Sequence, residues 1–364
     1  MPEIIAPSAP HYVPAPRTQI DLDYANLPII DRERARTPEG RRALAHEARN
    51  AMTEHGFFYV INHGTTQAQI ERLFDIADVP FAQVSDEEKP KYSEQGNNGS
   101  YQGYKLRQYW HIENGAKDQI EHYNVNRDVK KREHPEALRP FLPEIDAFAR
   151  HNHEQVLHPI LRLLAQGLEL PEETLVDMHE YSAAGESSVR FMKYYPRSKE
   201  EELKTKNVWL KGHTDTGSIT ILYSQPVAAL QILTKEGQWK WVKHIDNALV
   251  INAGDAIEFL SGGFYKATIH RVVQPPPDQQ SYTRLGMFYF AMANDDVKLA
   301  PLMQSPVLQR VGVTRSAAGV DAPTMEAWRI GRTAAYGVTE LKMADKEKGI
   351  EEEIISGIVV RHYN

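Results

Sequence analysis

A succession of short β-rich runs between residues 189 and 293 constrains the fold of this chain more than any other feature. The runs are rich in β-branched and aromatic residues, and turn-forming residues separate them. Gly254-Asp255 and Gly262-Gly263 are expected to form hairpin turns of this kind. About eight closely spaced strands favour an antiparallel jelly roll over a parallel sheet. The expected strands cover residues 190–194, 218–223, 230–233, 239–241, 249–252, 256–260, 270–273 and 285–291.

Helical patterns dominate the sequence before these strands. Thr37 is expected to cap a helix that ends near residue 54, with Pro38 in its first turn and Gly56 as its stop. A long amphipathic helix covers about residues 142–168, and Pro159 inside it should kink or split it. The apolar run at residues 56–61 predicts a buried strand, whereas residues 89–125 are polar and loop-rich.

These patterns together predict a mainly β fold with flanking helices around a double-stranded β-helix (jelly-roll) core. Residues 1–25 are Pro-rich and should form an extended N-terminal arm. Residues 26–310 should form one unit, with a helical N-terminal part (26–185) and the jelly-roll core (186–300). Residues 311–364, which include the charged stretch 340–353, are expected to form a helical C-terminal extension.

Composition narrows the classes of function. The formal net charge of −7 gives no electrostatic reason to expect nucleic acid or an anionic membrane as a partner. No apolar run approaches the roughly 20 residues of a membrane span, and residues 1–16 lack the features of a signal peptide. The absence of cysteine excludes thiolate metal sites, iron–sulfur clusters and cysteine nucleophiles. We expect a cytoplasmic protein without a nucleic-acid or membrane partner, and its oligomeric state stays open.

One cluster of metal-ligating residue types falls within the β-rich region. His213 and Asp215 stand two residues apart, and on a strand such residues point to the same face. His270 follows Asp215 by 55 residues (270 − 215), enough for several strands to bring it back alongside. Two imidazoles and one carboxylate form the facial triad of non-haem iron(II) oxygenases. The second His-x-Asp, His244 and Asp246, lies between two expected strands and is assigned a solvent-exposed connecting role.

Several short motifs surround this cluster in a fixed order. They are Pro28-Ile29-Ile30-Asp31, the run from Gly56 to Gly64, Tyr194-Tyr195-Pro196, His213-Thr214-Asp215, Leu230-Gln231, Asn252-Ala253-Gly254-Asp255, Leu260-Ser261 and His270-Arg271-Val272. With these motifs the chain resembles the isopenicillin N synthase-like family of 2-oxoglutarate and iron(II)-dependent dioxygenases over about residues 25–310. The resemblance implies a site in which His213, Asp215 and His270 hold iron(II).

The resemblance also implies a site for 2-oxoglutarate. Arg284, 14 residues after His270 (284 − 270), takes the place of the arginine that holds the far carboxylate of the co-substrate. Tyr195 takes the place of a tyrosine whose hydroxyl contacts it. The chain departs from the family pattern twice, with Gly286 where a serine is usual and Lys193 where an asparagine is frequent.

The activity implied is oxidation of a small molecule, by hydroxylation, desaturation or a related reaction, with O₂ as oxidant and release of succinate and CO₂. A specialised metabolite is the expected substrate. The aromatic residues Tyr101, Tyr104, Tyr109 and Trp110 either line the substrate mouth or form an ordinary packed loop. Two alternatives stay open, an iron-dependent oxidase of the same fold that does not use 2-oxoglutarate and a non-catalytic jelly-roll binding protein.

Overall fold

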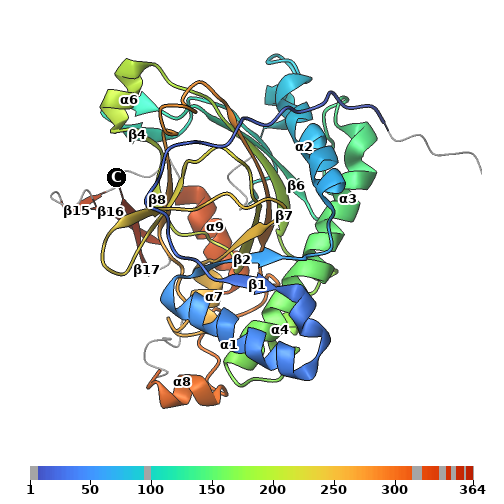
Figure 1. The fold of residues 1–364 in the computed structure, drawn as a ribbon, viewed down its shortest axis with the longest axis vertical. Helices are drawn as coiled ribbons and strands as arrows, with labels where there is room; N and C mark the ends of the chain where they lie inside the picture. Colours follow the sequence, from blue (N-terminus) through green and yellow to red (C-terminus); the bar gives the residue numbers. More distant parts are fainter. Residues whose placement is uncertain are drawn as a thin grey trace, which may run out of the picture.

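Two large sheets form the centre of the computed structural model, which describes residues 7–93, 100–313, 322–335, 342–345, 350–355 and 358–363 (Figure 1). The first sheet has eight strands in the order β1 (Ile29–Asp31), β2 (Phe57–Ile61), β12 (Leu249–Ala253), β9 (Ile219–Tyr223), β14 (Arg284–Ala291), β7 (Ser188–Tyr194), β6 (Ile120–Asn126) and β3 (Gly103–Lys105). The second has seven, in the order β11 (Trp239–Trp241), β10 (Leu230–Leu233), β13 (His270–Val273), β8 (Val208–His213), β17 (Ile358–Tyr363), β16 (Ile350–Ile355) and β15 (Lys342–Asp345). Strands β4 (His111–Glu113) and β5 (Ala116–Lys117) form a separate pair.

Helices pack against the outer face of the first sheet, and its inner face lines the barrel (Figure 1). Side chains of a strand alternate between faces. In β14, Leu285, Met287 and Tyr289 therefore join the core formed with the helices, whereas Phe288 joins the core between the sheets. The helices are α1 (Pro38–Glu54), α2 (Gln67–Ala82), α3 (Leu142–Arg150), α4 (His158–Gly167), α5 (Thr174–Asp177), α6 (Lys199–Thr205), α7 (Asp255–Leu260), α8 (Pro306–Arg310) and α9 (Met325–Ala335).

The N-terminal helices agree with the sequence prediction. The Thr37 side chain accepts a hydrogen bond from the Gly40 amide and caps α1, which ends at Glu54. The expected long helix is divided, because a π-helical segment, His151–Leu157, separates α3 from α4. Pro159 stands at the start of α4, where a missing amide hydrogen is tolerated.

The expected strand at residues 256–260 is wrong, because these residues form helix α7. A short apolar run does not distinguish a buried strand from a buried helix by its periodicity. Gly254 is the N-cap of α7 rather than part of a hairpin turn, and a β-carbon there would lie 2.7 Å from the carbonyl oxygen of Asp215. Gly262 and Gly263 follow the end of α7, both with positive φ, so they do not form a strand hairpin either.

The C-terminal extension is also not simply helical. Helix α9 is followed by the strands β15, β16 and β17, and Tyr363 of β17 pairs with Gly212 of β8. The charged stretch 340–353 gives no clear strand signal in the sequence, because it contains few apolar residues that could mark one face of a strand. The β-branched residues of β16 and β17 favour a strand. Glu351 forms an ion pair with Lys211 of β8, 2.6 Å between Oε2 and Nζ.

The region at residues 89–125 contains more regular structure than its polar sequence indicates. Strands β3 to β6 lie within it or reach its end, and every residue of β6 is buried. Strand β8, which carries His213, is likewise absent from the expected strands. Both β6 and β8 contain polar residues that face buried partners, so hydrophobic periodicity alone does not identify them.

Residues 7–26 contain no helix and no strand of the two sheets, and this arm crosses the outside of the molecule (Figure 1). Hydrogen bonds fix the arm at several points along its length. The Tyr12 amide donates to Asp75 over 2.7 Å, the Gln19 amide donates to Asp278 over 2.7 Å, and the Ala25 amide donates to the Trp241 carbonyl over 2.8 Å.

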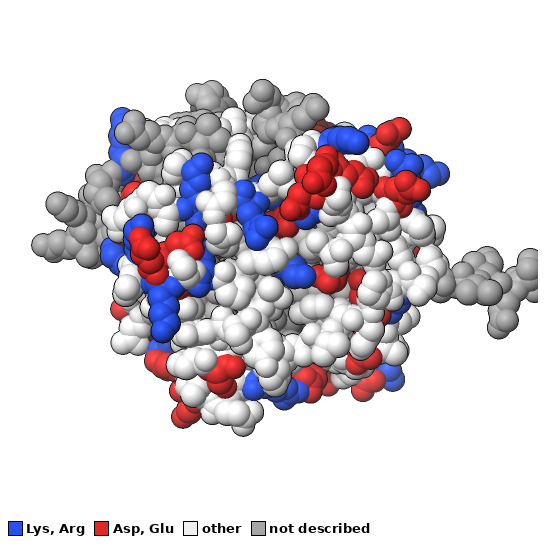
Figure 2. All heavy atoms as spheres, turned by 90° about the horizontal axis from the view of Figure 1, so that it is seen from above, with Lys and Arg blue, Asp and Glu red and all other residues white. Residues whose placement is uncertain are grey.

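The surface and the helices give two further observations. Basic and acidic side chains are interspersed over the described part of the face shown in Figure 2, so no extended basic surface forms there. None of the helices that the structure describes is long and apolar enough to span a bilayer. The first observation agrees with the net charge of −7.

Buried histidines behind the first sheet predict how stability depends on pH. The ring of His153 donates from Nε2 to the His179 carbonyl over 2.6 Å and contacts the Tyr289 hydroxyl over 2.7 Å through Nδ1. Burial lowers the pKa of His153 to about 3 and that of His179 to about 4. Both rings therefore stay neutral in the folded protein at neutral and mildly acidic pH.

We expect the metal-free protein to lose stability below about pH 6.5. In the unfolded chain both histidines titrate near their usual pKa of about 6.5, so acid protonates the unfolded state first. Each ring then lowers the free energy of unfolding by about 1.4 kcal/mol per pH unit down to about pH 4. Urea unfolding at about pH 7.5 and about pH 5 measures this change, and equal free energies at the two values would contradict it.

Candidate active site

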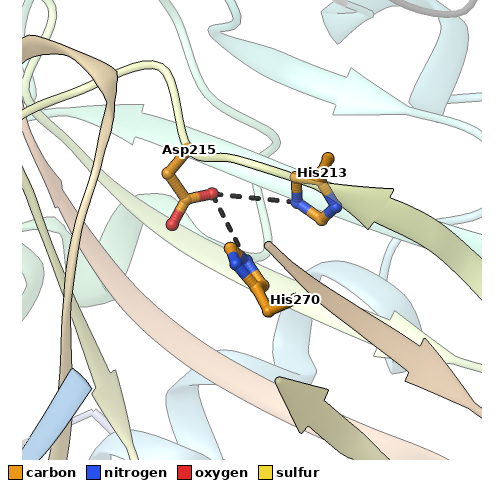
Figure 3. A group of neighbouring side chains, drawn as sticks. All are labelled: His213, Asp215 and His270. Atoms are coloured by element: carbon orange, nitrogen blue, oxygen red, sulfur yellow. Dashed lines mark ion pairs between the residues drawn. The ribbon is translucent and has the colours of Figure 1, made fainter. Parts of the chain in front are cut away.

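The three predicted metal ligands lie together inside the barrel. His213 ends β8, His270 begins β13, and these two residues pair directly across the antiparallel strands. Asp215 lies in the loop just after β8 rather than on the strand itself. Its Oδ1 atom is 3.8 Å from Nε2 of His213 and 3.7 Å from Nε2 of His270 (Figure 3). The ligand atoms all lie within 4.8 Å of one another, the spacing of donors around one ion.

Hydrogen bonds fix the orientation of each of these side chains. The Nδ1 atom of His213 donates to the Lys211 carbonyl over 2.8 Å, and that of His270 donates to the Thr268 carbonyl over 3.1 Å. A carbonyl oxygen only accepts, so each Nδ1 carries the hydrogen and each Nε2 presents a lone pair to the centre of the site. This is the arrangement that metal-ligating histidines usually adopt.

The carboxylate of Asp215 is held from its other oxygen. Oδ2 accepts hydrogen bonds from the Thr220 hydroxyl over 2.6 Å and from the Asn252 side-chain amide over 2.8 Å. Oδ1 is thereby left facing the two imidazoles. Thr220 lies on β9 and Asn252 on β12, so the first sheet orients a ligand that follows a strand of the second.

Burial and mutual contact shape the protonation of the site. Burial, together with a smaller contribution from the neighbouring His270, lowers the pKa of His213 to about 3. Burial alone raises the pKa of Asp215, but the two imidazoles and the bonds from Thr220 and Asn252 outweigh it, so the net shift is downward. A neutral imidazole and an ionised carboxylate are the ligand forms that a divalent ion requires. The donor set of two nitrogens and one oxygen therefore fits iron(II) with open positions.

The second His-x-Asp does not form such a site. His244 lies in a connection between β11 and β12, where its ring contacts Ser224 over 2.7 Å and Asp246 over 3.0 Å. The Asp246 side chain is 66% exposed and pairs with Arg17 of the N-terminal arm. The pair lies in a connection as predicted, but the expected solvent exposure holds only for Asp246, because the His244 side chain is 16% exposed.

Arg284 lines the same cavity as the three ligands. Its side chain lies at the start of β14 and is buried, and its Nε and Nη1 atoms make no hydrogen bond with the residues that the structure describes. The guanidinium lies 5.3 Å from the centre of the Tyr194 ring. Burial lowers the pKa of Arg284, but an arginine stays charged. A buried cation with unused donors fits a ligand carboxylate.

The co-substrate contact predicted for Tyr195 is wrong, because this side chain points to the other face of the sheet. Its hydroxyl donates to Glu121 over 3.2 Å, and Arg107 lies over its ring on the outside of the barrel. Tyr194 lines the cavity instead. The alternation of β7 explains the difference, because Tyr194 shares the inner face with Met192 whereas Tyr195 continues the outer face.

The two departures from the family pattern have separate structural explanations. Lys193 projects from the outer face of β7, where its Nζ atom lies 2.7 Å from Asp78 of α2, so Met192 occupies the cavity-facing position. At Gly286 a β-carbon would lie 2.6 Å from the ring of Phe288. The Phe288 ring therefore occupies the space of the usual serine side chain and adds an apolar surface to the cavity.

The predicted aromatic group is divided between the cavity and the surrounding structure. Tyr101 and Trp110 line the cavity. Tyr104 is buried behind it, donates to the Pro80 carbonyl over 2.8 Å and packs against Tyr123, so it belongs to the core. Tyr109 is 51% exposed and lies outside the cavity. The substrate-binding prediction is therefore wrong for Tyr104 and Tyr109.

The cavity also contains residues that the sequence analysis did not identify as part of the site. Arg190 and Arg332 both line it. The alternation of β7 would have identified Arg190 only with Tyr194 on the inner face, because Arg190 lies four residues before Tyr194, whereas the prediction placed Tyr195 there. Arg332 lies on α9, beyond the residues that resemble the family, and no motif marks it.

Two family models and a similar known protein all indicate the same family for this chain. Residues 27–144 match the model of the non-haem dioxygenase in morphine synthesis N-terminal region, and residues 186–293 match that of the 2OG-Fe(II) oxygenase superfamily. The chain is 30% identical over 251 residues to flavonol synthase/flavanone 3-hydroxylase of Petunia hybrida, covering 67% of this chain and 68% of that protein.

Solved structures show the same fold. A full-length protein of Neurospora crassa, crystallised in complex with alpha-KG and 5-formyluracil, superposes with a TM-score of 0.74 at 20% identity, covering 87% of this chain and 99% of that one. The crystal structure of JOX2 in complex with 2OG, Fe and JA superposes with a TM-score of 0.62 at 25% identity, covering 83% of this chain and 84% of that one. The fold of this chain is therefore that of known 2-oxoglutarate-binding proteins.

Proposed function

Since the chain belongs to the 2OG-Fe(II) oxygenase superfamily, we propose that its His213, Asp215 and His270 side chains hold the iron(II) and that Arg284 binds the far carboxylate of 2-oxoglutarate. The protein is a 2-oxoglutarate-dependent dioxygenase with iron(II) and 2-oxoglutarate as cofactor and co-substrate. One observation carries the assignment of residues: the three ligands and a buried arginine with unused donors line one cavity.

The residues of the chain bind the metal and the co-substrate, orient them and exclude water from the site. When bound, iron(II) with 2-oxoglutarate and O₂ supplies the oxidising power for attack on a C–H bond, with release of succinate and CO₂. The Lys211 and Thr268 carbonyls accept from the two Nδ1 atoms and so fix the rings in the orientation that turns each Nε2 toward the metal. Arg284 neutralises a carboxylate that would otherwise be buried without a partner. Apolar side chains that line the cavity, among them Phe288 and Leu222, keep water from the reacting atoms.

The substrate is proposed to be a small molecule of the specialised-metabolite class. Similarity to flavonol synthase/flavanone 3-hydroxylase and to JOX2 supports this class. The formal net charge of −7 gives no electrostatic reason to propose a nucleic-acid partner. The cysteine-free composition is compatible with the proposed cytoplasmic location.

Anaerobic spectroscopy tests the proposed site. Addition of iron(II) and 2-oxoglutarate to the metal-free protein should produce a weak visible charge-transfer band, and His270→Ala should lose it. His244→Ala is the matched control, because it removes the histidine of the second His-x-Asp, and it should keep the band. A band of equal intensity in His270→Ala would contradict the ligand assignment. In air, succinate formation should depend on added 2-oxoglutarate, and full substrate oxidation without succinate formation would contradict the co-substrate.

A pair of tyrosine variants tests whether Tyr194, rather than Tyr195, contacts 2-oxoglutarate. Tyr194→Phe should weaken 2-oxoglutarate binding about five- to tenfold, because a hydroxyl donor on the cavity wall is lost and such a bond contributes about 1 kcal/mol. Its present partner, the sulfur of Met192 at 3.3 Å, is only a weak acceptor. Tyr195→Phe should change the affinity less than about twofold. Titration of the charge-transfer band with 2-oxoglutarate measures both, and the opposite order would restore the role first predicted for Tyr195.

A further inference from the structure

We propose that the substrate of this cavity carries one negative charge, a carboxylate on an apolar body, and that Arg190 binds that carboxylate. This inference rests on the proposed function and adds the chemical class of the substrate. It follows from the position of Arg190, from its unused donors and from the balance of charges around the cavity.

Arg190 lies on the inner face of β7 and lines the cavity together with the metal ligands. Its Nε atom donates to the side-chain oxygen of Asn124 over 2.7 Å. The guanidinium lies over the Phe290 ring, 4.6 Å from its centre. These two contacts fix the orientation of the guanidinium plane. Its two terminal nitrogens form no hydrogen bond or ion pair with the described residues. A fixed guanidinium with two free donors is the geometry that binds a carboxylate by a fork.

The position of Arg190 separates it from the 2-oxoglutarate site. In the pairing of β14 with β7, Arg284 lies opposite Tyr194 and Phe288 lies opposite Arg190. Four residues along these strands correspond to roughly 13 Å. Arg284 is the arginine assigned to the co-substrate, so the guanidinium at the other end of the cavity is left for a second anion.

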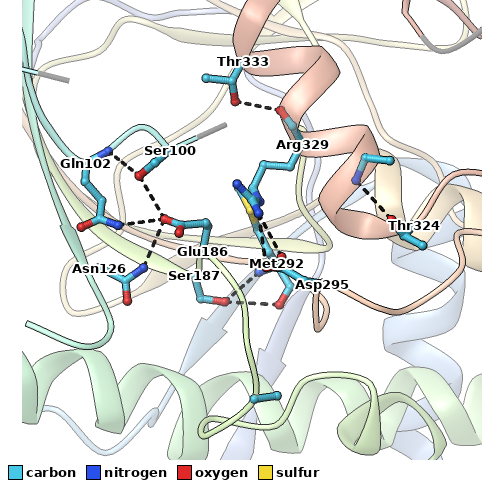
Figure 4. Close-up of polar contacts among 12 residues, drawn as sticks. Ser100, Gln102, Asn126, Glu186, Ser187, Met292, Asp295, Thr324, Arg329 and Thr333 are labelled. Atoms are coloured by element: carbon cyan, nitrogen blue, oxygen red, sulfur yellow. Dashed lines mark hydrogen bonds and ion pairs between the residues drawn. The ribbon is translucent and has the colours of Figure 1, made fainter. Parts of the chain in front are cut away.

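The other charges around the cavity balance without Arg190. Glu186 accepts hydrogen bonds from Ser100, Gln102 and Asn126 (Figure 4), and Lys131 lies 2.5 Å from its second oxygen. Figure 4 also shows that Arg329 pairs with Asp295 on the neighbouring wall.

The ligand site and the second wall arginine are balanced as well. Arg332 lies 3.6 Å from Asp255. In the loaded site, the charges of Asp215 and dianionic 2-oxoglutarate offset those of iron(II) and Arg284. Arg190 is then the one charge among the described lining residues that lacks an opposite charge. A charge in a cavity of low dielectric favours a ligand that neutralises it, so a monoanionic substrate fits best.

The walls next to Arg190 define the rest of the substrate. Phe288 and Phe290 follow one another along the inner face of β14, and Met292, just after the strand, also lines the cavity. Tyr101 completes the surface around the guanidinium. These side chains offer contact area but few hydrogen bonds, which favours an apolar or aromatic body. The carboxylate on Arg190 would then hold this body in a fixed orientation toward the metal ligands.

Matched pairs of acids and amides test the inference on the loaded enzyme. The probes are 3-phenylpropanoate, 2-naphthylacetate and octanoate, each compared with its neutral primary amide. They are titrated into the anaerobic complex with iron(II) and 2-oxoglutarate, and binding is followed by the change in the charge-transfer band and by the fluorescence of the cavity residue Trp110 and its fellow tryptophans. We expect at least one acid to bind tenfold or more tightly than its amide. Arg190→Gln should abolish the difference, and Arg190→Lys should keep part of it.

Arg107→Gln is the matched control, because Arg107 also lies over an aromatic ring, that of Tyr195, but outside the cavity. It should keep the preference for acids. The 2-oxoglutarate band without probe should be unchanged in Arg190→Gln, which shows that the variant folds and binds the co-substrate. If the band forms normally and no acid binds more tightly than its amide, this inference is wrong while the proposed function stands. If no band forms in the unaltered protein, the proposed function fails first.

Discussion

Arg284→Gln is expected to weaken 2-oxoglutarate binding by about two to three and a half orders of magnitude. Removing one partner of a buried ion pair costs about 3–5 kcal/mol, because the other charge stays buried without a counter-charge, and about 1.4 kcal/mol corresponds to a factor of ten. The Nε and Nη1 atoms of Arg284 make no hydrogen bond with the described residues, so few contacts within the protein compensate for the loss. Titration of the charge-transfer band with 2-oxoglutarate measures the effect.

The same variant should fold at least as well as the unaltered protein when no ligand is present. A buried guanidinium without a carboxylate partner destabilises the folded state, as the lowered pKa of Arg284 indicates. The thermal midpoint of the metal-free Arg284→Gln protein should therefore equal or exceed that of the unaltered protein. Iron(II) binding should also persist, because Arg284 contacts none of the three ligands in the described structure.

Two controls separate this role from a general effect of charge in the cavity. Arg284→Lys keeps the positive charge but loses the planar guanidinium that can donate two parallel hydrogen bonds to a carboxylate. It should therefore recover only part of the affinity for 2-oxoglutarate. Arg190→Gln removes a charge from the other end of the cavity and should leave this affinity unchanged. A 2-oxoglutarate affinity within threefold of normal in Arg284→Gln would exclude the arginine as the carboxylate site.

The sequence located the cluster of candidate metal ligands because its signal does not depend on exact strand bounds. His213 and His270 needed only to lie on neighbouring strands, and they do so although β8 was not among the expected strands. Arg284 was selected through the family resemblance, which places an arginine at this distance after His270, and it lines the same cavity. Residue type, order along the chain and the resemblance together identified these positions without exact strand bounds.

The predictions were wrong where strand register, an ambiguous short apolar run or pairing with a distant strand decides the structure. Tyr194 and Tyr195 are the same residue type, and only the register of β7 decides which of them faces the cavity. Helix α7 was taken for a strand because its short apolar run fits either period. Pairing with β8, which the local sequence does not specify, accounts for the C-terminal strands.

The C-terminal extension contributes the residue with the second large expected effect. Arg332 of α9 donates from Nη2 to the Thr214 carbonyl over 2.9 Å and lies near the Thr216 hydroxyl, 3.3 Å from Nε. On the other side of the loop, the Asp255 amide donates to the Asp215 carbonyl over 2.7 Å. Arg332 and the start of α7 therefore hold the loop that presents the carboxylate ligand.

Arg332→Met is expected to weaken iron(II) binding about 10- to 100-fold, the usual effect of losing a group that orients a metal ligand. It should also lower the free energy of unfolding by about 3 kcal/mol, because the buried Asp255 loses its counter-charge. Burial already raises the pKa of Asp255, and Arg332 counteracts that rise. Chelator competition measures the affinity for iron(II), and urea unfolding measures the stability.

Two further variants separate metal affinity from stability. Arg329→Met removes a second buried arginine of α9, whose guanidinium pairs with Asp295 at 3.2 Å. It should lower stability and leave the affinity for iron(II) unchanged. Arg332→Met combined with Asp255→Asn removes both charges, so stability should largely recover while the affinity stays low, because the Thr214 carbonyl still lacks its donor. Equal iron(II) affinities in Arg332→Met and Arg329→Met would show that α9 stabilises the fold without positioning Asp215.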